Sequence, residues 1–113
     1  MELTQLKNLV MEALADLKAK EILVLDVAEL TSVTDTMIIC SGTSSRHVKS
    51  LADYVVEKVK ASGGSILGRE GERQGEWALV DLGDVVVHVM LPKIRDYYAI
   101  ERLWDMKPLR EVA

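Results

Sequence analysis

Two apolar runs separated by a two-residue turn constrain the fold of this chain more than any other feature. The runs cover residues 76–82 and 85–91, and Gly83-Asp84 between them has the length and chemistry of a β-hairpin turn. Side chains alternate between the two faces of a strand. One face therefore carries only aliphatic residues, namely Ala78, Val80, Leu82, Val85, Val87, Val89 and Leu91. The other face carries a mixed set, namely Trp77, Leu79, Asp81, Val86, His88 and Met90.

Helical periodicity earlier in the chain predicts what covers the aliphatic face. Apolar residues recur at three- and four-residue spacing over 3–17 and again over 48–59, which is typical of amphipathic helices. Ser44 or Ser45 is a candidate N-cap for the second helix, and Gly63-Gly64 ends it. Apolar runs at 22–27 and 36–41 predict two further strands.

The remaining segments complete a predicted order of α-β-β-α-(β)-β-β-α. The glycine-rich stretch 68–75 predicts a mobile connection, and Pro92 begins a final helix in which one of the adjacent Tyr97 and Tyr98 must reach the surface. This order predicts an α/β fold with a mixed sheet of about five strands and helices mainly on one face. We expect a single domain over residues 1–106 and a flexible C-terminal tail at 107–113.

Composition narrows the classes of function. The formal net charge of -4 argues against wrapping nucleic acid and favours a basic protein as partner. The single cysteine, Cys40, lies in an apolar run and suits a buried thiol in a reducing compartment. No apolar run approaches the roughly 18 residues of a membrane span, and residues 1–4 lack a signal pattern, so we expect a cytoplasmic protein without membrane association.

The mixed face of the hairpin is the candidate binding surface. If Ala78, Val80 and Leu82 face the helices, Trp77 must face away from them. A tryptophan on the solvent side contributes little to the core of its own domain, so its presence suggests that a second chain covers it. Large exposed apolar patches usually mark interfaces. The pattern therefore predicts a binding protein before any family is considered.

Two enzyme-like arrangements compete with this interpretation. The turn Gly42–His47 could hold an anion with backbone amides, hydroxyls and Arg46, although a capped helix explains the same residues. Carboxylates could also gather around Mg²⁺ for phosphoryl transfer, but their spacing matches no metal motif and turns explain two of them. These carboxylates are Asp26, Asp35, Asp81 and Asp84.

Histidine and cysteine add no further chemistry. His47, His88 and Cys40 form no metal cluster of recognisable spacing, so a zinc site is not expected. For His88, contact with a partner and plain packing remain equally open. We predict no catalytic residue, no metal and no cofactor, with a nucleotidyltransferase-like, metal-dependent phosphoryl-transfer enzyme as the alternative.

The run Thr34–Val48 (TDTMIICSGTSSRHV) resembles the signature of the ribosomal silencing factor family, also called the Iojap family. Further blocks match that family in order and spacing, from about Leu3 to Trp104. They are Glu70-Gly71, Gly75–Trp77, Asp81–His88, Arg95–Tyr98 and Leu103-Trp104. Met37 and Met90 stand where many members carry an aromatic residue, which replaces one bulky apolar group by another.

The resemblance implies a fold similar to the nucleotidyltransferase lineage but without its catalytic carboxylates, and therefore no enzymatic activity. It implies docking on the universal large-subunit ribosomal protein number fourteen, with little direct nucleic-acid contact. Such docking blocks joining of the small subunit and represses translation when nutrients are scarce. It also implies a homodimer, and whether that dimer covers the docking surface or leaves it free stays open.

Carried over residue by residue, the resemblance places the ribosomal-protein contact surface on the mixed face of the hairpin and around it. Trp77 and Met90 would supply the apolar anchor, while Glu70 and Asp81 would pair with Lys or Arg of the basic partner. The full set is Glu70, Trp77, Asp81, His88, Met90 and Tyr98, together with Arg46 and Arg95.

Overall fold

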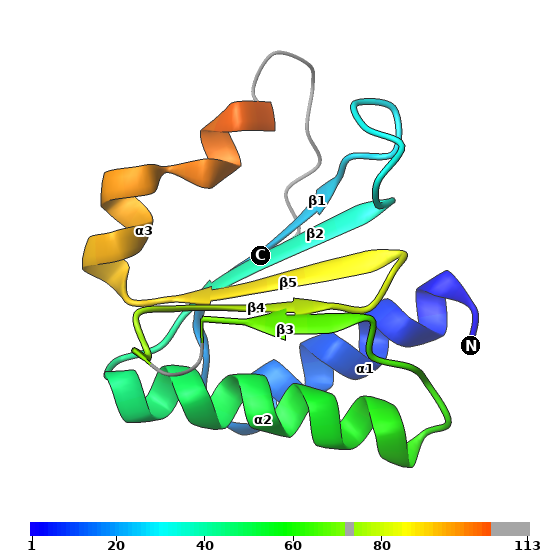
Figure 1. Cartoon of the computed structure of the whole chain (residues 1–113), viewed down its shortest axis with the longest axis horizontal. Helices are drawn as coiled ribbons and strands as arrows, with labels where there is room; N and C mark the ends of the chain where they lie inside the picture. The colour runs from blue at the N-terminus through cyan, green and yellow to red at the C-terminus, as the bar shows by residue number, and fades with distance from the viewer. Residues whose placement is uncertain (72–73, 105–113) are drawn as a thin grey trace.

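A five-stranded sheet runs through the middle of the molecule and separates two helices from a third (Figure 1). The computed structural model describes residues 1–71 and 74–104, so the tail predicted at 107–113 lies outside the described residues. The elements are α1 (Leu3–Asp16), β1 (Lys20–Asp26), β2 (Thr36–Ser41), α2 (Ser45–Ala61), β3 (Gly68–Glu70), β4 (Trp77–Asp81), β5 (Val85–Met90), α3 (Pro92–Tyr98) and the 3-10 helix η1 (Ile100–Trp104).

The strand order is β1-β2-β5-β4-β3, which confirms the predicted mixed α/β sheet. Strands β2 and β5 pair in parallel, and the other neighbouring pairs are antiparallel. The predicted hairpin joins β4 and β5, where the Leu82 N–H donates to the Val85 carbonyl over 2.9 Å. Gly83 opens the turn at φ +89°, a conformation that glycine adopts without steric penalty.

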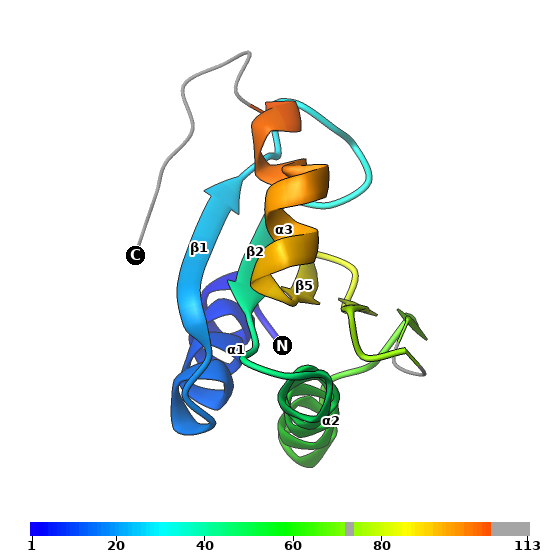
Figure 2. The ribbon, with the colours of Figure 1, turned by 90° about the vertical axis from the view of Figure 1, so that its left-hand side faces the viewer.

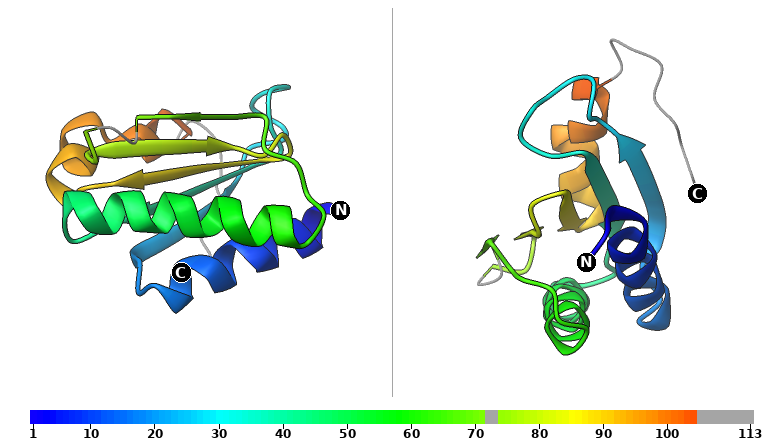
Figure 3. Two further views of the ribbon diagram at one scale, coloured as in Figure 1. Left: turned by 60° about the horizontal axis from the view of Figure 1, so that its bottom comes forward. Right: turned by 90° about the vertical axis from the view of Figure 1, so that its right-hand side faces the viewer.

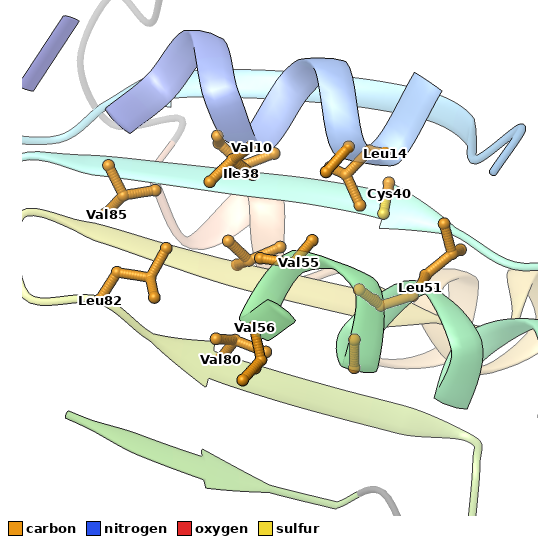
Figure 4. Packing of buried hydrophobic residues seen from close by; sticks show 14 of the residues in the cluster. Val10, Leu14, Ile38, Cys40, Leu51, Val55, Val56, Val80, Leu82 and Val85 are labelled. Carbon is orange, nitrogen blue, oxygen red and sulfur yellow. The ribbon is translucent and has the colours of Figure 1, made fainter. Parts of the chain in front are cut away.

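Helices α1 and α2 pack side by side against the aliphatic face of the sheet (Figures 2 and 3). Val10 and Leu14 of α1 meet Ile38 and Cys40 of β2, and Val55 of α2 lies over the middle strands (Figure 4). The hairpin residues predicted to face these helices, Ala78, Val80, Leu82, Val85, Val87 and Val89, are all buried. The alternation thus assigned this face correctly.

The ends of α2 follow the predicted capping chemistry. The Ser44 hydroxyl accepts from the His47 N–H over 3.1 Å, so Ser44 rather than Ser45 is the N-cap. Gly63, at φ +86°, terminates the helix in the left-handed region.

The optional strand of the predicted order is present, but it lies within the stretch 68–75 that was predicted as a mobile connection. Residues Gly68–Glu70 form β3, which pairs antiparallel with β4 at one edge of the sheet. Three residues, one of them glycine, carry too little alternation to fix the bounds of a strand, so the pairing with β4 decides them.

The final helix was also predicted as one piece and is broken in two. Helix α3 ends at Tyr98 because Ala99 takes the left-handed conformation at φ 45°, and η1 continues from Ile100. Together they fold over the sheet face opposite α1 and α2 (Figures 1 and 2). A second, smaller core lies beneath them, made of Leu25, Val27, Met37, Ile39, Met90 and Ile100. The face expected to be bare is therefore partly covered.

Arg95 ties α3 to the sheet. Its guanidinium donates to the Glu21 carbonyl over 2.8 Å, to the Ser41 hydroxyl over 3.1 Å and to a Glu101 carboxylate oxygen over 3.1 Å. Glu21 sits at φ 47° in an irregularity of the β1–β2 register, where a strand ladder leaves carbonyls unpaired. Only 7% of Arg95 is exposed, so these bonds satisfy a buried charge.

Replacing Arg95 by Ala is expected to lower the free energy of unfolding by about 3 kcal/mol, because Glu101 and the Glu21 carbonyl lose their partner. Urea denaturation measures the change. Arg102→Ala is the control, because this arginine of η1 is exposed and its loss is expected to change stability by less than about 0.5 kcal/mol. Equal effects of the two substitutions would contradict this role of Arg95.

Candidate protein-docking surface

The sheet face opposite α1 and α2 is divided into a covered part and an open part. Helices α3 and η1 cover β1, β2 and the C-terminal end of β5 (Figures 1 and 2). Within the described residues, no helix crosses β3 and β4 on this side. Side chains on the uncovered part are half-buried or exposed. We call them the open face, and they are Glu70, Trp77, Leu79, Asp81 and Val86.

The strand register brings these residues together. Glu70 on β3 pairs with Leu79 on β4, which pairs in turn with His88 on β5. Asp81 pairs with Val86 in a neighbouring row. Side chains at paired positions point to the same side of a sheet. The open face is therefore an apolar strip with carboxylates on it.

Trp77 stands at one end of the open face within a row of aromatic rings. Its indole Nε1–H donates to His88 Nδ1 over 3.0 Å, and its ring centroid lies 5.0 Å from that of Tyr98. Tyr98 makes an edge contact with Tyr97 at 5.0 Å, and both tyrosines are exposed, 53% for Tyr98 and 80% for Tyr97. The row leads from the sheet across α3 into solvent.

The alternation correctly placed Trp77 on the side away from α1 and α2. The indole is half-buried, because it packs against the second core and against the Tyr98 ring. It is neither sealed inside the domain nor fully solvent-facing. A half-buried, oriented aromatic ring is a common anchor at protein interfaces.

Three predicted contact residues are not on the surface. Met90 is 0% exposed in the second core, Arg95 is held by its buried hydrogen bonds, and His88 is 7% exposed and hydrogen-bonded to Trp77. The expectation that these side chains touch a partner directly is corrected for this state of the chain. Alternation identifies the face of a strand residue, but whether a later helix folds over it depends on the tertiary structure.

The two predicted acidic contacts differ in their surroundings. Glu70 is exposed, while its neighbour Arg69 points to the other side and pairs with Asp53 of α2 over 2.6 Å. Asp81 is half-buried, and one carboxylate oxygen accepts from the Gly83 N–H over 2.9 Å. Asp81 thus shapes the hairpin turn as well as contributing charge to the open face.

Arg46 is exposed in the first turn of α2, a helix on the side of the sheet opposite α3 (Figure 3). This turn packs closely against the segment before β4, where Gly75 lies against Ser45, but no contact of Arg46 with the open face is observed among the described residues. Neighbouring groups that could have bound an anion have internal partners. The Thr43 N–H donates to His47 Nδ1 over 2.8 Å, and His47 Nε2 donates to the Leu17 carbonyl over 2.6 Å. The turn links α1 to α2.

The carboxylates of the enzyme alternative do not form a metal site in the described part of the chain, where no three His, Cys, Asp or Glu side chains cluster suitably. Asp26 accepts from the Ala28 N–H over 3.3 Å, and Asp81 serves the hairpin turn. Burial raises the pKa of the Cys40 thiol to about 12, so this group is protonated and not nucleophilic.

A small α/β domain with an aromatic and acidic face left open is typical of protein-binding modules. The family model described as "Ribosomal silencing factor during starvation" matches residues 1–113. The chain therefore belongs to the ribosomal silencing factor family, as its sequence motifs predicted.

Relatives and a solved structure agree with this assignment. The chain is 54% identical over 104 residues to a ribosomal silencing factor of Chromobacterium violaceum, covering 92% of this chain and 85% of the relative. It is 42% identical over 99 residues to that of Haemophilus influenzae, covering 88% and 97%. A crystal structure of a Chromobacterium violaceum protein matches with a TM-score of 0.91 at 50% identity, covering 100% and 94%.

Two further expectations concern the likeness to nucleotidyltransferases and a membrane-spanning helix. The likeness to nucleotidyltransferases stays a prediction, since the matching solved structure is that of a close relative. Among the described residues, no helix has both the length and the apolar character needed to cross a membrane.

Stability should fall on acidification because of His88. Burial lowers the pKa of His88 from 6.5 to about 4. Above pH 6.5 the imidazole is neutral in both states; between pH 6.5 and about 4 the unfolded chain takes up the proton first. The free energy of unfolding should therefore drop by about 3 kcal/mol across this range.

Denaturant titrations at several pH values, on the wild type and on His88→Asn, measure this contribution. The asparagine keeps a polar acceptor but does not titrate, so its stability should depend less steeply on pH. Identical pH dependence of the two proteins would contradict the prediction.

Proposed function

We propose that this chain binds the large ribosomal subunit through the open face and sterically blocks joining of the small subunit, repressing translation during starvation. The observation that carries the proposal is the half-exposed Trp77 on the same face of the sheet as the carboxylates of Glu70 and Asp81. The family assignment supports a role in ribosome silencing during starvation, and the open face supports binding to a protein partner as its mechanism.

The partner that fits this face is a basic protein, and we infer the universal large-subunit ribosomal protein number fourteen from the family resemblance. Leu79 continues the apolar surface from Trp77 along β4, and Val86 lies beside Asp81 at the far end of the open face, while the two carboxylates can pair with Lys or Arg. The chain's net charge of -4 disfavours direct binding to RNA phosphates. Steric exclusion needs no catalytic group, cofactor or metal.

A second copy of the chain is the competing occupant of the open face. We propose a cytoplasmic homodimer on the family resemblance alone. Light scattering on the wild type and on an open-face variant would test whether the dimer uses this surface, because only then does the variant become monomeric.

Trp77→Ala should weaken binding to free large subunits by about 30-fold or more, which corresponds to roughly 2 kcal/mol for the loss of an interface anchor. Co-sedimentation with purified subunits and a subunit-joining assay measure the effect. Some loss of folding stability is also expected, since the ring packs against Tyr98. A folded Trp77→Ala protein that silences normally would overturn the proposed function.

Glu70→Lys should weaken the same binding by about tenfold, mostly through a slower association rate that becomes less sensitive to salt. Glu57→Lys makes the same charge change at an exposed position of α2 on the other side of the sheet and serves as the matched control. Asp81→Asn adds a milder test, since the amide oxygen can still accept from Gly83. Equal weakening by Glu57→Lys would indicate a general charge effect rather than a docking face.

A further inference from the structure

The indole of Trp77 is held from two sides by its own domain. The Tyr98 ring lies 5.0 Å from the Trp77 ring and tilted by 49°. At its nitrogen, the indole donates its single hydrogen bond to His88 Nδ1 over 3.0 Å. The Nε1–H is therefore already used, and the indole presents ring surface rather than a donor to a partner.

The sheet register sets this arrangement. Trp77 pairs with Met90 and Leu79 pairs with His88, so Trp77 and His88 are diagonal neighbours on one face of the β4–β5 ladder. His88 is only 7% exposed whereas Trp77 is half-buried, so a docked partner would meet Trp77 first.

We propose that His88 is a positioning residue for docking: its imidazole fixes the orientation of the Trp77 indole on the open face and does not itself contact the partner. This inference rests on the proposed function of the open face. It changes the role expected for His88 from a contact to a support beneath the contact.

The chemistry of the imidazole suits this role at neutral pH. Accepting through Nδ1 requires the neutral tautomer with the proton on Nε2. Burial lowers the pKa of His88 to about 4, so the acceptor is present under physiological conditions. Restricting the two side-chain torsions of Trp77 before binding removes part of the entropy that docking would otherwise lose.

The variant pair His88→Phe and His88→Asn separates positioning from simple packing. Phenylalanine keeps a flat ring but removes the acceptor, whereas the asparagine oxygen lies near the place of Nδ1 and restores it. We expect His88→Phe to weaken binding to large subunits by about tenfold, mainly through faster dissociation, and His88→Asn to recover most of the loss.

Nuclear magnetic resonance of the indole Nε1–H gives a readout that does not depend on ribosome binding. The Trp77 resonance is assigned from its disappearance in Trp77→Phe. In the wild-type protein this proton should exchange slowly with solvent; in His88→Phe it should exchange faster and shift upfield, and in His88→Asn it should return towards the wild-type behaviour. The wild-type measurement does not depend on the folding of either His88 variant.

Three results would overturn the inference. The first is fast solvent exchange of the Trp77 Nε1–H in the wild-type protein. The second is faster exchange in His88→Phe with unchanged binding to large subunits, and the third is wild-type exchange in His88→Asn without recovery of that binding. Normal binding by Trp77→Ala would instead remove the proposed function itself. The failures of the two ideas are thus distinguishable.

Discussion

The contact between Arg95 and the β1–β2 end of the sheet holds α3 and η1 in place, and the division of this sheet face depends on it. Its guanidinium satisfies the Glu21 carbonyl at the irregular start of β1, the Ser41 hydroxyl at the end of β2 and the carboxylate of Glu101 in η1. A buried guanidinium requires such partners, and they come from three separate segments of the chain. The bonds hold α3 and η1 over one part of the sheet.

Because α3 is held there, the same sheet face serves two purposes. Beneath α3 and η1 it forms a second core around Met90 and Ile39, while β3 and β4 keep their outer side open. Trp77 lies on the border between these parts, with Tyr98 on the covered side and Leu79 on the open strand. Its surroundings combine a rigid support with an accessible ring, which suits recognition of another protein.

The residues predicted from the family motifs fall into two groups in the structure. The family motifs led to the correct family and to Trp77 and Glu70, which lie on the open face. They also led to Met90 and Arg95, which the structure places in the interior, and to His88, which is buried and accepts a hydrogen bond from Trp77. Residues that recur in a family pattern can support a binding surface without being part of it. The motif alone does not distinguish these roles.

What the sequence by itself determined was local: the β4–β5 hairpin through Gly83, the face on which Ala78 and Trp77 lie, and the N-cap at Ser44 to within one residue. These follow from strand periodicity and from turn and capping chemistry, which act over a few neighbouring residues. The tertiary structure alone decided the position of β3, the break at Ala99 and the burial of His88. Each depends on contacts between distant segments, whose free energy outweighs the weak local preferences of the residues involved.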